Sequence, residues 1–282
     1  MNLPQNIVSK ITALGAGLDL KKIGLHKQKS KIKKTRIYHV PNQYASNKQQ
    51  LLYELLTNID LPKFVFSRRG ASYVDNARYH IGSHYLVNVD IKNFYPSINY
   101  KRIGHIFSEL RIKISAIEPL TYLTTCDKYL PLGFVTSPFL SNLVLLKVDN
   151  DLFKLSRNNK VKYSRYVDDV SFSSNHEIDE KFIQGATRVL KSMGFSLNDS
   201  KTRIYGPSDK KIVHGLVLED HTITISQEYL NLVKVHIEEL QNRKKNKVNF
   251  TESKSRVDGE LSFIKYIDMK KYNDLVTSYS LE

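Results

Sequence analysis

Apolar runs bounded by turn residues mark the β-strands that this chain is predicted to form. They lie near residues 85–91, 161–167, 170–173 and 212–218, and we expect antiparallel pairing. Asp90 stands at the end of the first run, while Asp168 and Asp169 lie in the turn between the second and third. If these strands lie side by side, the three carboxylates meet at one edge of a sheet.

Helical spacing of apolar residues predicts helices before, between and after these strands in the sequence. One set of apolar residues ends before Pro62: Leu51, Leu52, Leu55, Leu56 and Ile59. Helices near 138–155 and 179–193 are expected to pack on one face of the sheet, the first with Ser137 as N-cap and Pro138 at its first position. A narrow apolar stripe follows on a helix capped by Ser226: Leu230, Val233, Ile237 and Leu240. The pattern predicts an α+β protein.

Composition and charge favour a folded protein with a polyanionic partner. A chain of 282 residues with 41% hydrophobic residues can bury a sizeable core. Its formal net charge of +15 favours nucleic acid, because lysine and arginine gain affinity when they displace counterions from phosphates. The excess of basic residues is most concentrated in residues 1–60, ahead of the first aspartate strand.

Cysteine content and hydropathy point to a soluble, cytoplasmic protein. Cys126 is the single cysteine, so no internal disulfide can form, and the scattered histidines offer no zinc spacing. No apolar segment reaches membrane-spanning length, and residues 1–20 lack the pattern of a signal peptide. We therefore expect neither zinc nor a membrane as a partner.

The adjacent pair Asp168 and Asp169 is the most informative chemical feature. Two neighbouring carboxylates repel each other, and a rigid hairpin that presents both needs a compensating cation. Hard oxygen ligands favour Mg²⁺, with Mn²⁺ as a substitute. Taken alone, the pair is also compatible with a solvated turn, because aspartate is a favoured turn residue. Asp90 would complete the metal site.

Further segments, in this order and spacing, resemble the blocks of reverse transcriptases. They are residues 130–142, residues 194–202 with Lys201, and the apolar run around Val213-His214-Gly215. Residues 76–80 (Asn-Ala-Arg-Tyr-His) resemble the NAxxH signature of bacterial retron enzymes, and Val213-His214-Gly215 resembles their VTG triplet with the middle residue changed. Two positions depart from the family: Val167 stands where alanine is commoner, and Leu132 where most members have glutamine.

This resemblance implies a right-hand polymerase fold with fingers, an antiparallel-sheet palm and a short helical thumb. The fingers would comprise residues 1–85 together with 109–133. The palm would comprise 86–108 and 134–220, and the thumb 221–282.

The resemblance also assigns roles to the acidic residues and to one aromatic residue. Two Mg²⁺ ions would be bridged by Asp90 and Asp168, with Asp169 in a supporting role and the carbonyl of Ile91 on the nucleotide-bound ion. Tyr95 matches the aromatic gate whose ring would clash with a ribose 2′-hydroxyl; alternatively, it is a core aromatic residue.

Other residues are candidates for contacts with nucleotide or RNA. Arg36 and Lys201 would bind the triphosphate, and Gly133 would let the backbone approach the nascent base pair. The candidates for RNA recognition are Asn76, His80, Lys244 and Lys245. Asn76 and His80 could instead be capping or packing residues that shape the RNA-binding face, and we expect His214 to be a satisfied strand residue.

The implied function is RNA-directed DNA synthesis of retron type. The enzyme would use deoxynucleoside triphosphates to copy part of a cognate structured non-coding RNA into a small RNA-linked DNA, primed from a guanosine 2′-hydroxyl. A role in antiphage defence with a separate effector protein follows from the same resemblance. Two alternatives are open: another bacterial reverse transcriptase, of abortive-infection or group II intron type, and an RNA-binding scaffold with a decayed polymerase site.

Overall fold

The computed structural model describes residues 3–29, 37–246 and 249–280. The chain divides into two units. Unit 1 comprises Met1–Ser72, Val87–Phe172 and Ile178–Arg203, and unit 2 comprises Tyr73–Leu86, Ser173–Glu177 and Ile204–Glu282. Fingers, palm and thumb are a finer division, and their boundaries stay a prediction. Among the described residues, no helix has both the length and the apolar character needed to cross a membrane.

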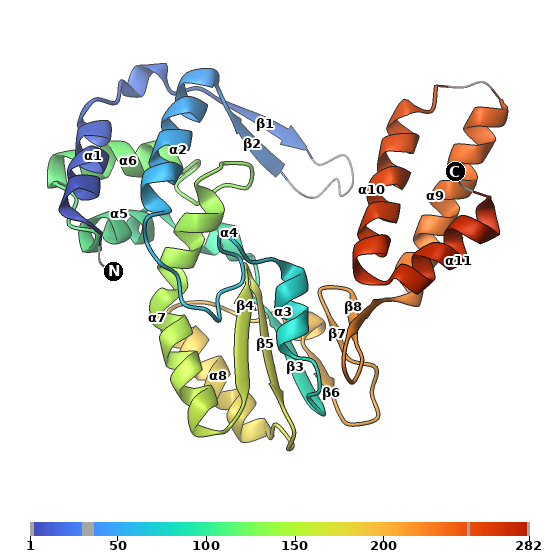
Figure 1. The fold of residues 1–282 in the computed structure, drawn as a ribbon. Helices are drawn as coiled ribbons and strands as arrows, with labels where there is room; N and C mark the ends of the chain where they lie inside the picture. Colours follow the sequence, from blue (N-terminus) through green and yellow to red (C-terminus); the bar gives the residue numbers. More distant parts are fainter. Residues whose placement is uncertain (1–2, 30–36, 247–248, 281–282) are drawn as a thin grey trace. The chain divides into compact units, whose positions relative to one another are not determined.

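Unit 1 contains most of the helices and a two-stranded hairpin (Figure 1). Its helices are α1 (Gln5–Ala16), α2 (Gln43–Leu56), α4 (Phe94–Ser97), α5 (Tyr100–Glu109), α6 (Ile114–Thr124), α7 (Ser137–Asn158) and α8 (Glu180–Ser192). Short 3-10 turns cover Leu20–Lys22 and Asp199–Lys201. Helices α1, α2, α5 and α6 pack against one another. Strands β1 (Leu25–Lys29) and β2 (Ile37–Pro41) pair antiparallel, with Leu25 opposite Pro41.

A four-stranded sheet carries the residues of greatest interest. Its strand order is β4 (Lys162–Tyr166), β5 (Asp169–Ser174), β3 (Tyr85–Asp90) and β6 (Arg203–Tyr205). Helices α7 and α8 lie together on one face (Figure 1), where apolar residues of α8 such as Ile183 and Leu190 meet Val87 and Val89 of β3. The helices predicted near 138–155 and 179–193 are therefore present and placed as expected.

Side-chain caps explain where several helices begin. The side chains of Asn42, Asn99, Asp179 and Ser226 each accept a hydrogen bond from a backbone N–H of the helix that follows. The prediction for α7 was wrong by one residue: Ser137 is its first helical residue and not its N-cap. Pro138 still lies in the first turn, where a missing N–H costs nothing.

Unit 2 packs its helices and a small sheet around its own core. The elements after α3 (Tyr73–Tyr79) are β7 (Ile212–Val213), β8 (Leu216–Leu218), β9 (Ile223–Ile225), α9 (Gln227–Lys245), α10 (Thr251–Ile267) and α11 (Met269–Tyr279). The predicted stripe of Leu230, Val233, Ile237 and Leu240 is buried in this core. The apolar face of α9 is thus the one read from the sequence.

The single strand predicted over residues 212–218 is instead a tight hairpin. Strands β7 and β8 pair antiparallel, with Val213 opposite Leu216. His214 and Gly215, which join them, have φ angles of 53° and 80°. A two-residue hairpin loop of this kind needs positive φ at both positions. The apolar run hid the turn because histidine is not among the usual residues of such loops.

Candidate active site

Three aspartates lie at neighbouring strand ends of unit 1. Asp90 is the last residue of β3, Asp168 lies in the turn after β4, and Asp169 opens β5. Strands β5 and β3 are neighbours in the sheet. The N–H of Ile91 donates to the carbonyl of Asp168 at 3.2 Å, which ties the end of β3 to the hairpin tip. The structure therefore brings together the carboxylates that the sequence predicts to meet.

The carboxylates influence one another electrostatically. Burial, together with the negative charges of Asp169 and Asp90, raises the pKa of Asp168 to about 6, while Lys201 opposes the shift. Such a shift means that negative charge accumulates where water screens it poorly. A divalent cation would relieve this repulsion, and carboxylate oxygens are the ligands that Mg²⁺ and Mn²⁺ prefer. The donor chemistry of the aspartates fits such an ion, although their carboxylates do not offer oxygens that all lie within 4.8 Å of one another.

Lys201 lies at this site and pairs with Asp90. Its Nζ is 3.1 Å and 3.2 Å from the two carboxylate oxygens of Asp90, and its side chain is 59% exposed. The N–H of Asn198 donates to the carbonyl of Asp90 at 2.9 Å, which holds the segment before Lys201 beside β3. The Asp90 side chain is only 13% exposed, but the lysine end of the pair is open to solvent. Pairs that water screens are worth about 0–1 kcal/mol, so an arriving metal ion or phosphate could displace the lysine. Its predicted contact with triphosphate stays a prediction.

Tyr95 lies close to Asp168 and is only partly buried. On the short helix α4, the neighbouring Phe94 is buried at 3% exposure, whereas Tyr95 is half-buried. Burial and, after it, the charge of Asp168 raise the pKa of Tyr95 to about 12, whereas a hydrogen bond with Ser141 opposes the shift. The effect of Asp168 places the phenol near the hairpin tip. Its role as a gate stays a prediction.

Gly133 lies where β2 approaches the loop before α7. The N–H of His39 donates to the carbonyl of Leu132 at 2.8 Å, and Gly133 has a φ angle of 105°. A Cβ on Gly133 would lie 2.5 Å from the carbonyl oxygen of His39. Glycine is therefore required here by contact with β2, a reason that the sequence did not reveal. Close approach to a base pair stays a prediction.

Gly133→Ala should destabilise the protein by at least about 3 kcal/mol, for two reasons. The added methyl group would overlap with the backbone of His39, and alanine is unfavourable at this positive φ. Gly70→Ala is the matched control: Gly70 also has positive φ, at 76°, but nothing lies within 4 Å of its Cβ position. The control should lose only about 1–2 kcal/mol. Urea unfolding of both variants measures the difference, and equal losses would show that β2 can move aside.

Asn76 and His80 are buried in unit 2. Both side chains are at 0% exposure. Asn76 Nδ2 lies 2.8 Å from His214 Nε2, and His80 Nδ1 lies 2.7 Å from Ser173 Oγ. These contacts fit the packing role that the sequence left open for both residues. Their direct contact with RNA stays a prediction.

The remaining candidates lie away from the aspartates in sequence. Lys244 and Lys245 are exposed in the last turn of α9, and Lys244 Nζ lies 5.8 Å from the ring centroid of Phe250. Arg36 lies outside the described residues. The assignments of all three to nucleic acid or triphosphate stay predictions.

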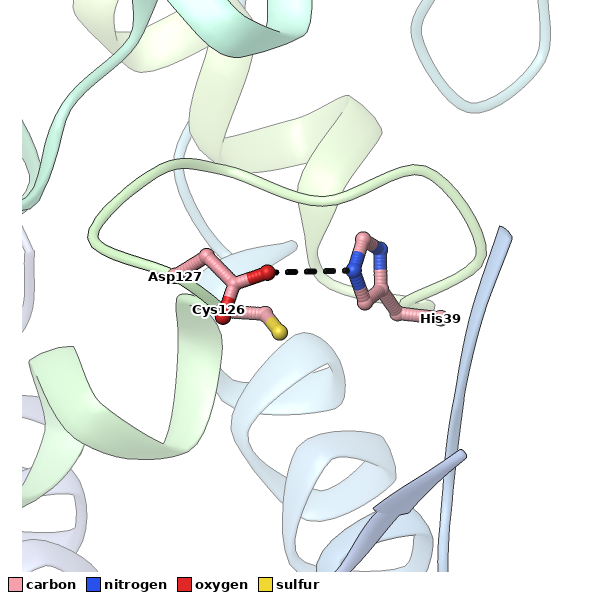
Figure 2. Close-up of side chains that lie close together, drawn as sticks. All are labelled: His39, Cys126 and Asp127. Atoms are coloured by element: carbon pink, nitrogen blue, oxygen red, sulfur yellow. Dashed lines mark ion pairs between the residues drawn. The ribbon is translucent and has the colours of Figure 1, made fainter. Parts of the chain in front are cut away.

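The structure also reveals a small group that the sequence did not suggest. His39, Cys126 and Asp127 offer a nitrogen, a sulfur and an oxygen within 4.8 Å of one another (Figure 2), and no other such group of three occurs within the described ranges. His39 Nε2 lies 4.0 Å from Asp127 Oδ2, and the Asp127 side chain is 63% exposed. The pairing of imidazole with carboxylate accounts for this contact without an ion, so we assign the group no function.

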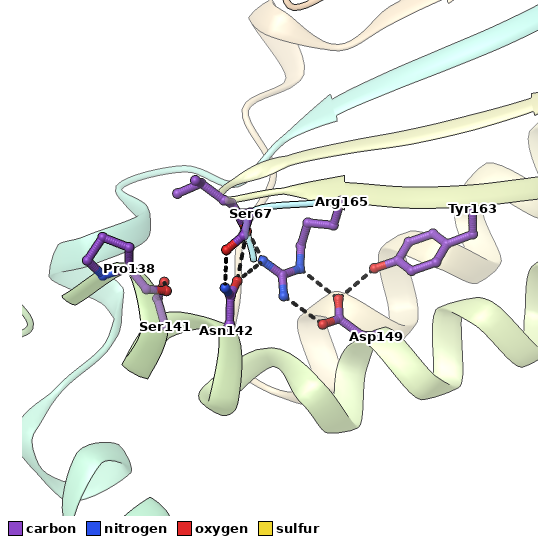
Figure 3. Close-up of polar contacts among 8 residues, drawn as sticks. Ser67, Pro138, Ser141, Asn142, Asp149, Tyr163 and Arg165 are labelled. Atoms are coloured by element: carbon purple, nitrogen blue, oxygen red, sulfur yellow. Dashed lines mark hydrogen bonds and ion pairs between the residues drawn. The ribbon is translucent and has the colours of Figure 1, made fainter. Parts of the chain in front are cut away.

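A second unexpected feature lies beside the hairpin of β4 and β5. Arg165 of β4 is 1% exposed and forms a bidentate ion pair with Asp149 of α7, with both N–O distances at 2.7 Å (Figure 3). Sequence reasoning missed this pair because two charged residues 16 positions apart show no pattern that indicates burial.

Comparison with known proteins places these features in context. A family model described as "Reverse transcriptase (RNA-dependent DNA polymerase)" matches residues 25–257. The retron Ec86 reverse transcriptase of Escherichia coli is 28% identical over 74% of this chain and 64% of its own length. The retron Ec73 reverse transcriptase of the same species is 27% identical over 87% of this chain and 83% of its own length. The chain thus spans slightly less than two thirds of the Ec86 protein.

Solved structures agree on the fold. Apo telomerase from Candida tropicalis, truncated from its C-terminal domain, superposes with a TM-score of 0.51 at 15% identity, over 73% of this chain and 54% of that one. At this identity the likeness concerns the fold alone. It confirms the expected α+β right-hand polymerase fold, in which helices are combined with antiparallel sheets.

Proposed function

Because the chain belongs to the reverse transcriptase (RNA-dependent DNA polymerase) family, we propose that it is an RNA-directed DNA polymerase of retron type. The observation that carries this proposal is the meeting of Asp90, Asp168 and Asp169 at one end of the sheet. The mutual influence of their charges supports it, because a site built for phosphoryl transfer must hold cations between carboxylates.

In the proposed mechanism the aspartates hold two Mg²⁺ ions, or Mn²⁺ in their place. Asp90 and Asp168 would hold the ions, Asp169 would support them, and the carbonyl of Ile91 would be a further ligand of the nucleotide-bound ion. When bound, such ions make the primer hydroxyl a better nucleophile and stabilise charge on the transferring phosphate. Lys201 releases Asp90 and binds the triphosphate of the incoming nucleotide. The ring of Tyr95 excludes the ribose 2′-hydroxyl.

The proposed substrates are deoxynucleoside triphosphates and a cognate structured non-coding RNA. The names of the Ec86 and Ec73 relatives support a retron product, a small DNA linked to RNA. We place the enzyme in the cytoplasm, as its single cysteine, Cys126, suggests. A role in antiphage defence with a separate effector belongs to the same proposal, and priming from a guanosine 2′-hydroxyl does too.

Primer extension tests the proposal directly. The purified chain should incorporate deoxynucleotides with Mg²⁺ on the structured RNA transcribed beside its gene, and more weakly on poly(rA)/oligo(dT). Extension only on the generic template would favour another bacterial reverse transcriptase. RNA binding without extension on either template would overturn the proposal in favour of an RNA-binding scaffold.

Binding to generic RNA should weaken by more than about tenfold between 50 and 200 mM salt, because phosphate contacts release counterions. Lys244→Gln/Lys245→Gln should reduce the salt slope, since both lysines are exposed at the end of α9. Lys181→Gln/Lys191→Gln on α8 removes the same charge from other exposed positions and serves as the control. Fluorescence anisotropy measures the slopes, and a flat salt response would contradict the electrostatic argument.

A further inference from the structure

The tip of the catalytic hairpin has an unfavourable backbone conformation. Val167, the residue before Asp168, has a φ angle of 57°. For a β-branched residue the left-handed region is a genuine outlier, because Cβ approaches the following carbonyl oxygen. Such a conformation persists only where surrounding contacts enforce it. The position of Asp168 depends on whatever holds Val167.

The side chain of Arg165 makes the contact that holds this residue. Arg165 Nη1 donates to the carbonyl of Val167 at 2.8 Å. The same nitrogen donates to Asn142 Oδ1 at 2.9 Å, while Nε and Nη2 donate to the two carboxylate oxygens of Asp149 (Figure 3). A guanidinium is planar and rigid, so fixing its other donors also fixes the direction of the bond to Val167.

The residues that receive these bonds are themselves held in place. Asp149 is at 0% exposure and accepts a hydrogen bond of 2.6 Å from the hydroxyl of Tyr163. Asn142 donates to the carbonyl of Ser67 at 2.7 Å. Both Asp149 and Asn142 belong to α7, the long helix of unit 1. The guanidinium therefore links α7 to the hairpin tip and fixes the position of the tip relative to this helix.

We propose that Arg165 is a positioning residue: its bond to the Val167 carbonyl, braced by Asp149 and Asn142, sets the hairpin tip so that Asp168 binds the metal ion. The inference rests on the proposed function. Stability alone is a weak reason for such a pair, because well-packed apolar residues can replace a buried ion pair without loss. A requirement for defined geometry at the metal site accounts for it.

The test replaces the whole polar cluster by apolar residues. Arg165→Met alone would leave Asp149 buried without its partner and is expected to unfold or strongly destabilise the chain. The triple variant Arg165→Met/Asp149→Leu/Tyr163→Phe avoids this, because no buried charge or unpaired phenol remains in the cluster. Tyr163→Phe alone is the control, since it weakens the brace on Asp149 but keeps the bond from Arg165 to Val167.

Two measurements separate positioning from a merely structural role. Electron paramagnetic resonance follows Mn²⁺ binding, and the Asp168→Asn variant identifies the signal of the site. The Mn²⁺ affinity should weaken by about tenfold or more in the triple variant. The Mg²⁺ concentration for half-maximal incorporation should rise by a similar factor, while the Tyr163→Phe control stays near wild type.

A folded triple variant with wild-type Mn²⁺ affinity and Mg²⁺ requirement would overturn the inference. A triple variant that does not fold would also overturn it, because the pair would then be structural. Wild-type protein that binds Mn²⁺ through Asp168 but extends no primer would refute the proposed function and leave the positioning role standing.

Discussion

Asp90→Asn and Asp168→Asn should each lower nucleotide incorporation by about a thousandfold or more. Metal ions contribute several kcal/mol of charge stabilisation in such reactions, and each ~1.4 kcal/mol is a factor of ten in rate. Either substitution removes a negative charge and a ligand oxygen without a change in side-chain volume. Asp169→Asn should also be severe, although residual activity is compatible with its supporting role.

RNA binding should survive these substitutions, because it depends on the basic surface and not on the carboxylates. Single-turnover extension and fluorescence anisotropy on the same preparations measure the two properties. Asp60→Asn, a change at an exposed carboxylate of unit 1, is the matched control and should behave as wild type. Near-normal synthesis by Asp90→Asn or Asp168→Asn would refute the assignment of the site.

Tyr95→Val should shift the preference between ribo- and deoxynucleotides by about tenfold to a hundredfold toward ribonucleotides. If the ring occupies the volume that a 2′-hydroxyl needs, its removal admits the larger sugar by relieving steric overlap. A core tyrosine truncated in this way would instead lower stability by about 3–5 kcal/mol and leave the preference unchanged.

The comparison needs incorporation efficiencies for matched nucleotide pairs, together with thermal midpoints. Phe94→Leu is the control, because Phe94 is the neighbouring ring that is buried. It should lower the midpoint and leave the sugar preference unchanged. An active Tyr95→Val variant with a wild-type sugar ratio would eliminate the gate.

The parts of the fold that sequence predicts well are those with local causes. The stripe on α9 and its cap at Ser226 follow from residues within a few turns of one another, and both are present. The sequence around His214 and Gly215 predicts one strand, whereas the structure has a hairpin. His214 adopts a left-handed backbone conformation, and histidine is not a typical turn residue. Backbone conformation at such positions is decided by tertiary contacts.

The same distinction applies to the site. Asp90 and the hairpin aspartates were predictable because each lies at the end of an apolar strand, and neighbouring strands bring their ends together. The pairing of Arg165 with Asp149 was not predictable from the sequence. Charged residues are expected to be exposed to solvent unless a partner is known. The contact of β2 with Gly133 joins segments nearly a hundred residues apart, and no local sequence pattern indicates it.

The contact between Asn76 and His214 links the two segments that resemble retron signatures. One residue belongs to the NAxxH-like segment and the other is the middle of the altered triplet, yet the two side chains form a single packing unit. The two segments therefore depend on each other through this contact. A substitution of His214 would therefore remove this partner from the amide of Asn76, which is at 0% exposure.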